Sequence, residues 1–147
     1  MAEQTFDLNE ITPEAFAQLV GVASDDQILE AMRGVGLETA LDRIFEGMRE
    51  RFAPDKAKGV NDVIQWVVND QGQEHAYNVS IHDGVCDMAK GRAGKSTVTL
   101  TTDLLSFVKL ISGHAHGPQL FMGGKLQISG NLMFATRVET FFDRPQA

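Results

Sequence analysis

The stretch FMGGKLQISGN, residues 121–131, carries the most information about the fold of this chain. Gly123-Gly124 ends a short apolar helix that Pro118 opens, because glycine readily ends a helix and proline suits its first turn. Residues 125–129 then alternate in polarity, which predicts a strand with one buried face. Gly130-Asn131 turns the chain into a C-terminal helix. That helix would carry Leu132, Met133, Phe134, Val138, Phe141 and Phe142.

Upstream of this stretch, the hydrophobic period of two predicts four more strands. Residues 63–68 and 77–82 alternate, and Asp83-Gly84 is a strong hairpin signal before a returning strand at 85–91. Residues 97–101 are rich in β-branched side chains, which favour strands. Because the connections are short, we expect the pairing to be mainly antiparallel.

The remaining segments show helical spacing. Thr12-Pro13 is a helix start, and Ser24 with Gln27 fits a capping box. The clearest helix spans residues 37–52, where apolar side chains recur every three or four positions, as on a core face. Thr102 is the expected cap of a further helix that ends at Gly113. The whole chain therefore reads as one small α+β domain preceded by two acidic helices.

The order of these elements resembles the sterol carrier protein 2 family. The shared features are an aromatic short helix, the motif Gly-Lys-Leu-x-Ile-x-Gly at residues 124–130, and an apolar C-terminal helix. Upstream, helix 37–52, the paired strands and the helix ending at Gly113 follow in the same order. The match covers about residues 37–143. Residues 1–36 have no counterpart, and the loop at His114-Ala115-His116 departs from the pattern.

This resemblance implies a mainly antiparallel five-stranded sheet, covered by helices on one side, with an apolar tunnel between the layers. It divides the chain into an acidic helical extension (1–36) and a lipid-binding domain (37–147). It also implies binding of a sterol, fatty acid or fatty acyl-CoA without catalysis, cofactor or metal. By position, the lining residues would be Ile64, Trp66, Val68, Tyr77, Val79, Ile81, Phe107, Ile111, Phe121, Met122, Leu126, Ile128, Phe134 and Phe141. Periodicity alone favours the plainer interpretation that these side chains pack on one another.

The charge distribution bears on partners. The net charge is −7, and residues 1–50 carry 11 acids against 3 bases, a net of −8. This asymmetry argues against nucleic-acid binding and disfavours tight docking to an anionic membrane. No signal peptide or membrane-spanning run is evident, and Cys86 is the single cysteine, so we expect a cytoplasmic protein. The acidic helices of residues 1–36 are candidates for docking a protein partner or a second copy.

Three patterns resemble a nucleotide-binding, a metal-binding or a nucleophilic site, and each is better interpreted as structural. Residues 91–97 resemble a phosphate-binding loop, but position 89 is alanine where that motif needs glycine, and a strand follows. The four histidines lack the spacing of a zinc site. Cys86 is interpreted as a buried strand thiol. These patterns leave the sequence without a predicted catalytic or metal site.

Two alternatives to simple lipid binding stay open at this point. An enzyme acting on an apolar substrate, of the ketosteroid isomerase type, would pair a carboxylate of raised pKa with a tyrosine donor. Tyr77 is the only tyrosine, with Asp62 and Asp103 as candidate carboxylates. The other alternative is an accessory module that docks onto a lipid-metabolising or steroid-metabolising enzyme.

Overall fold

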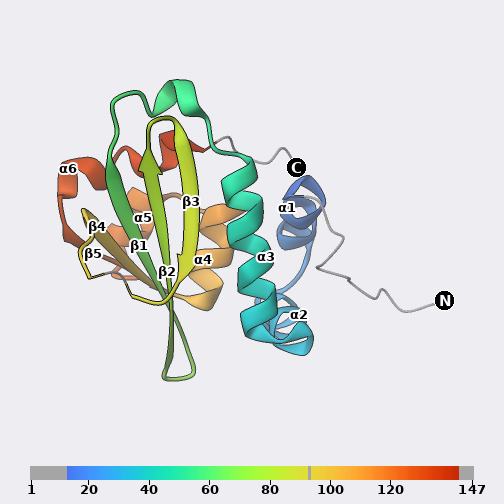
Figure 1. Cartoon of the computed structure of the whole chain (residues 1–147). Coiled ribbons are helices and arrows are strands. Elements are labelled where there is room, and N and C mark those ends of the chain that lie inside the picture. The colour runs from blue at the N-terminus through green and yellow to red at the C-terminus, as the bar shows by residue number, and fades with distance from the viewer. Residues whose placement is uncertain (1–12, 93, 143–147) are drawn as a thin grey trace.

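A five-stranded sheet forms the centre of the computed structural model, which describes residues 13–92 and 94–142. The strands lie in the order β3-β2-β1-β4-β5 (Figure 1). Their bounds are β1 Asp62–Asp70, β2 Gln73–His82, β3 Val85–Lys90, β4 Val98–Asp103 and β5 Leu126–Gly130. The predicted α+β class and mainly antiparallel sheet are confirmed. The exception is β4. The chain crosses over from β3 at one edge of the sheet, and β4 then pairs with β1 in parallel.

The register of the sheet places one row of side chains on the covered face. Trp66 of β1 lies opposite Tyr77 of β2 on one side and opposite Leu100 of β4 on the other. Leu100 in turn faces Ile128 of β5. Because paired residues project to the same face of a sheet, this row is continuous across four strands. Trp66, Leu100 and Ile128 of this row also line the cavity described below.

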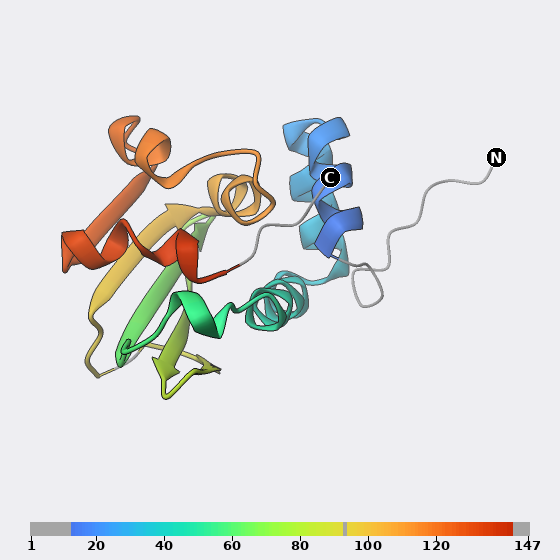
Figure 2. The same ribbon diagram turned by 90° about the horizontal axis from the view of Figure 1, so that it is seen from above.

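Helices cover this face of the sheet (Figures 1 and 2). α3 (Leu37–Glu50) and α4 (Leu104–Ile111) lie nearest to it, with α1 (Pro13–Val22) and α2 (Asp25–Val35) outside them. The chain also forms α5 (Gly117–Met122) and the short 3₁₀ helix η1 (Pro54–Lys56). No helix within the described ranges is long and apolar enough to cross a membrane.

The C-terminal segment differs from the expected single helix. It forms a four-residue helix α6 (Leu132–Ala135) and, after a break, a 3₁₀ turn η2 (Val138–Phe141). The hydroxyl of Thr136 bonds the carbonyl oxygen of Met133 at 2.7 Å, a local bond that competes with helical continuation. The amide of Ala53 also donates to the carbonyl oxygen of Phe141 at 2.8 Å. The end of the segment is thereby held against the turn that follows α3.

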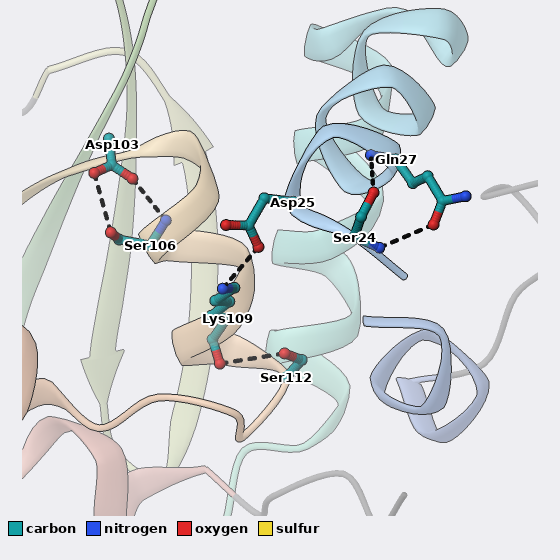
Figure 3. Close-up of polar contacts among 7 residues, drawn as sticks. All are labelled: Ser24, Asp25, Gln27, Asp103, Ser106, Lys109 and Ser112. Carbon is teal, nitrogen blue, oxygen red and sulfur yellow. Dashed lines mark hydrogen bonds and ion pairs between the residues drawn. The ribbon is translucent and has the colours of Figure 1, made fainter. Parts of the chain in front are cut away.

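Capping explains where two helices begin (Figure 3). The predicted capping box is present, since Ser24 Oγ accepts from the Gln27 amide at 3.1 Å and Gln27 Oε1 accepts from the Ser24 amide at 2.9 Å. The predicted cap of α4 is wrong by one residue. Asp103 caps it at 2.6 Å, while Thr102 remains in β4 and donates to the carbonyl oxygen of Lys125. The predicted start at Thr12 lies outside the described residues.

The N-terminal helices share the core of the rest of the chain. Phe16, Val20, Ile28 and Met32 are buried in one cluster with the sheet and α3. Ion pairs hold α2 at its edges, from Asp25 to Lys109 at 2.9 Å (Figure 3) and from Arg33 to Asp70 at 2.6 Å. His114 Nε2 lies 2.7 Å from the carbonyl oxygen of Ala17. Residues 13–35 therefore pack as part of one body, whereas the proposed boundary at residue 36 stays a prediction.

Packing requires a glycine at one position of residues 121–131. Gly130 has φ 104°, and a Cβ there would lie 2.6 Å from the carbonyl oxygen of Thr97. That carbonyl accepts from the amide of Asn131 at 2.9 Å. The close approach of β5 to the start of β4 therefore depends on glycine. It also fixes where the chain leaves the sheet to form α6.

Candidate functional site

A cavity of about 240 Å³ lies over the β1–β4–β5 part of the sheet, beneath α4, α5 and the C-terminal segment. Its wall is almost entirely apolar, as is typical of sites for small apolar ligands. The lining residues are Trp66, Leu100, Leu110, Gly117, Pro118, Phe121, Leu126, Ile128, Leu132, Ala135, Thr136, Val138 and Glu139.

The floor and inner walls of the cavity are formed by buried core residues. Trp66, Leu100 and Leu126 are each 4% exposed and stand on three neighbouring strands. Leu110 of α4 and Val138 of η2 are also buried and close the sides. A strand residue points to one face or the other by its position alone, so the sheet register sets this floor.

The mouth is formed by residues on α5 and α6. Phe121 is 45% exposed and Leu132 is 53% exposed, yet both line the cavity. α5 (orange) and α6 (red) lie at opposite ends of β5 (Figure 2). Both helices are short, with six and four residues, so few hydrogen bonds hold either of them. Movement of these two helices would change the size of the opening.

Glu139 is the one charged side chain in the lining. Its Oε2 accepts a 3.0 Å hydrogen bond from the backbone amide of Gly117, the first residue of α5. A Cβ at position 117 would lie 2.8 Å from that oxygen, so glycine permits the approach. Glu139 thus ties the C-terminal segment to the start of α5. It also places a carboxylate within reach of a bound molecule.

Trp66 combines apolar packing with an unmet polar group. Its ring contacts Phe107 edge to face, with centroids 5.3 Å apart. Its Nε1 is buried and has no hydrogen-bond partner among the described residues. An unsatisfied buried donor costs about 1–3 kcal/mol. This cost falls on a residue that lines the cavity.

The structure brings four of the fourteen predicted lining residues to this cavity: Trp66, Phe121, Leu126 and Ile128. Six others are core residues at most 1% exposed: Ile64, Val68, Val79, Ile81, Phe107 and Phe141. Tyr77 stacks on Phe45, Phe134 packs against Phe141, and Ile111 is partly buried. Met122 is 87% exposed. Ligand contact by these ten stays a prediction.

Sequence reasoning missed the remaining lining residues. Leu100 could have been found from the pairing of β4 with β1, because it stands in the same row as Trp66. Leu110 belongs to a predicted helix, and its place on the apolar stripe of that helix indicates only a core residue. Pro118, Thr136 and Glu139 carried no signal, because polar residues and prolines in turns are common on surfaces.

The groups considered for isomerase chemistry are not assembled into a site. The Tyr77 hydroxyl donates to Asp42 Oδ1 at 2.7 Å. Asp62 accepts from the Thr97 hydroxyl, and Asp103 caps α4. Burial, with a further contribution from Asp42, raises the pKa of Tyr77. Each group is thus committed to a structural contact, and none of these residues lines the cavity.

Cys86 is buried on β3. Burial raises the pKa of its thiol to about 11, with Asp87 adding to the shift. A thiol with that pKa is almost wholly protonated at neutral pH and is a poor nucleophile. Its environment is that of a buried structural thiol.

Residues 41–143 match the family model of the SCP-2 sterol transfer family. The oleate-induced peroxisomal protein POX18 of Candida maltosa is 32% identical over 76% of this chain and 90% of its own length. A fatty acid-binding protein of Yarrowia lipolytica is 30% identical over 71% of this chain and 87% of its own length.

Solved structures share the fold. Apo sterol carrier protein 2 from Yarrowia lipolytica superposes with a TM-score of 0.58 at 24% identity, over 67% of this chain and 86% of that one. The sec-alkylsulfatase Pisa1 from Pseudomonas sp. gives 0.63 at 19% identity. That match covers 70% of this chain and only 16% of the sulfatase, so the likeness concerns one segment of a larger enzyme.

Proposed function

Since the chain belongs to the SCP-2 sterol transfer family, we propose that it is a non-catalytic carrier of an apolar lipid. The lipid would occupy the cavity beside Trp66, with its acyl chain or ring system over the floor of β1, β4 and β5. The classes we propose are a sterol, a fatty acid or a fatty acyl-CoA. The observation that carries the proposal is a nearly all-apolar cavity with a rigid strand floor and a mouth built from two short helices.

The energetics of such a cavity favour a lipid chain. Each methylene group removed from water contributes about 0.8 kcal/mol. A volume of about 240 Å³ is slightly below the usual range for drug-sized ligands, roughly 300–1,000 Å³, so a long ligand needs the mouth to open. Outward movement of α5 and α6 supplies that room without disturbing the floor, because Leu100 and Leu126 stand on strands. The printed names of the two relatives, which mention oleate and fatty acid, support an acyl ligand.

Ligand titration with a cavity-filling variant tests the proposal. Ala135 lines the cavity, so Ala135→Phe fills part of it while deleting no core side chain. Trp66 is the only tryptophan, so its fluorescence reports on the cavity directly. We expect oleate, oleoyl-CoA or cholesterol to change that fluorescence in the natural chain, and Ala135→Phe to weaken binding at least tenfold.

The matched control for this titration is Ala89→Phe. Ala89 is exposed on β3 and lies opposite Asn78, outside the cavity. The control should bind like the natural chain. Equal binding by Ala135→Phe and the natural chain would contradict the assigned cavity. A natural chain that binds none of the three ligands would contradict the proposed function.

Two further assignments remain proposals with their own tests. One is a partner or second copy docked on residues 1–36, which sedimentation of the chain with and without charge changes at Asp26 and Glu30 would detect.

The other is the location of the protein in the cell. A relative is named as a peroxisomal protein, while the sequence led us to expect the cytoplasm. Microscopy of the chain, tagged at either end, decides between them.

A further inference from the structure

Large apolar side chains gather on the surface around the cavity mouth. Of the six large apolar residues exposed in the described part of the chain, four are Phe121, Met122, Leu132 and Met133. We call these four the apolar rim. Met122 and Met133 are 87% and 79% exposed, so neither side chain belongs to the core. Exposed apolar side chains that are grouped, unlike ones scattered singly, mark sites of contact with a protein or a membrane.

The rim and the cavity are continuous. Phe121 and Leu132 belong to the lining, and each is followed in sequence by one of the exposed methionines. Figure 2 shows α5 and α6, which carry these residues, on the side of the molecule opposite α1 and α2. Whatever contacts the rim therefore meets the entrance of the cavity.

The charge around the rim is opposite to that of the chain as a whole. Residues 104–139 contain Lys109, Lys125 and Arg137 against one carboxylate, that of Glu139, which accepts from the Gly117 amide, although the chain carries a net −7. Lys109 pairs with Asp25 of α2, which leaves Lys125 and Arg137 as the exposed cations of this segment. In the sequence, Lys125 stands between the rim residues of α5 and those of α6, and Arg137 follows two residues after the end of α6. On the opposite side (Figure 2), α2 carries the acidic residues Asp25, Asp26 and Glu30 against the single base Arg33.

We propose that the apolar rim is a docking surface for an anionic phospholipid bilayer. Met122 and Met133 would enter the headgroup–acyl boundary, Lys125 and Arg137 would meet the lipid phosphates, and the cavity mouth would open against the acyl chains. Each basic residue held at an anionic surface strengthens partitioning by about fivefold. The acidic helices, facing away, orient the molecule. The low affinity for anionic membranes expected from the charge of residues 1–50 therefore does not apply to this face.

Charge also decides between a bilayer and a second copy of the chain. Two rims packed face to face would bring Lys125 and Arg137 of both copies together. The one carboxylate of residues 104–139, that of Glu139, already accepts from the Gly117 amide within each copy and lines its cavity. An anionic bilayer supplies both the apolar phase and the opposite charge that the surface lacks. This inference goes beyond ligand binding and does not depend on which lipid occupies the cavity.

Vesicle flotation of the full chain tests the proposal. The probes are phosphatidylcholine vesicles with and without about 30 mol% phosphatidylserine. We expect binding to the anionic vesicles to be at least tenfold tighter. The double change Met122→Ser with Met133→Ser should lower that binding at least tenfold, because it removes the inserting groups. Lys125→Gln with Arg137→Gln should abolish the preference for anionic vesicles.

The control is Val22→Ser with Val85→Ser, which removes the other two exposed apolar residues, on α1 and β3. It should bind vesicles like the natural chain. Equal binding to both vesicle types, or full binding by the methionine variant, would overturn the proposal. A dimer that the methionine changes dissociate, with vesicle binding unaltered, would assign the rim to a second copy instead. Ligand titration without vesicles is measured in parallel, so loss of docking is distinguished from loss of lipid binding.

Discussion

The hydroxyl of Tyr77 on β2 donates a 2.7 Å hydrogen bond to Oδ1 of Asp42 on α3. The Tyr77 ring stacks on Phe45, one turn further along the same helix, with centroids 4.2 Å apart. Lys90 Nζ lies 3.0 Å from Asp42 Oδ2, so the carboxylate is shared between two strands. This contact holds α3 against the sheet on the side away from the cavity.

Tyr77→Phe should therefore lower stability without affecting ligand binding. The change removes the hydrogen bond and keeps the stacked ring, and a bond to a charged acceptor contributes about 1.5–3 kcal/mol. We expect a loss near the lower figure in urea unfolding, because Asp42 keeps the contact with Lys90. Asp42→Asn retains an acceptor and should cost less. A tenfold loss of lipid affinity in Tyr77→Phe would contradict the structural role.

Stability should fall at alkaline pH. The pKa values of Tyr77 and of Cys86 are raised in the folded state, that of Cys86 to about 11. Above the unfolded pKa of a thiol, about 8.5, the unfolded chain loses this proton before the folded chain does. Unfolding is then favoured as pH rises, because the folded state binds more protons. The stabilising contribution of Cys86 is present below pH 8.5 and is lost towards pH 11.

Urea midpoints measured between pH 7 and pH 11 check this prediction. Cys86→Ala should lower the midpoint at pH 7, because it deletes a buried side chain. It should also flatten the decline between pH 8.5 and pH 11. A decline of the same slope in Cys86→Ala would assign the alkaline transition to other groups.

Glu139 should discriminate between lipid headgroups. Its carboxylate lines an otherwise apolar cavity and is held by the Gly117 amide. A fatty acid carboxylate placed beside it meets like charge, whereas the hydroxyl of a fatty alcohol can donate to it. Glu139→Gln should raise affinity for oleate severalfold and leave affinity for oleyl alcohol nearly unchanged, as measured by Trp66 fluorescence. Parallel changes for both ligands would place the headgroup away from Glu139.

The strands were predictable because strand periodicity is a local signal, whereas the place of their side chains in a cavity was implied by the family resemblance. Trp66, Leu126 and Ile128 alternate with neighbours of the opposite face, and the structure places all three at the cavity. Leu100 was missed because short connections suggested antiparallel neighbours, whereas β4 pairs with β1 in parallel. That choice depends on long-range packing of α4 and α5, which no short window of sequence contains.

The mouth of the cavity was less predictable for a related reason. Phe121 and Met122 are equally apolar neighbours, and only the position of α5 decides that one lines the cavity while the other is exposed. The expected C-terminal helix breaks at Thr136, so Glu139 reaches Gly117 instead of continuing a helical face. Helix ends depend on weak, competing hydrogen bonds, and their outcome is settled by tertiary contacts.

Trp66→Phe should be an unusually mild core substitution. Truncation of a large buried side chain to alanine ordinarily costs about 3–5 kcal/mol, and Phe107→Ala, at a fully buried neighbour of Trp66, should show that loss. Trp66→Phe removes less volume and also removes the unpaired Nε1 donor, which offsets about 1–3 kcal/mol of the cost. We expect a net loss below about 1 kcal/mol in urea unfolding, and tryptophan emission should vanish because no other tryptophan exists. A loss as large as that of Phe107→Ala would mean that Nε1 has a partner in solution, such as a bound water molecule, and that Trp66 is held as tightly as any other core residue.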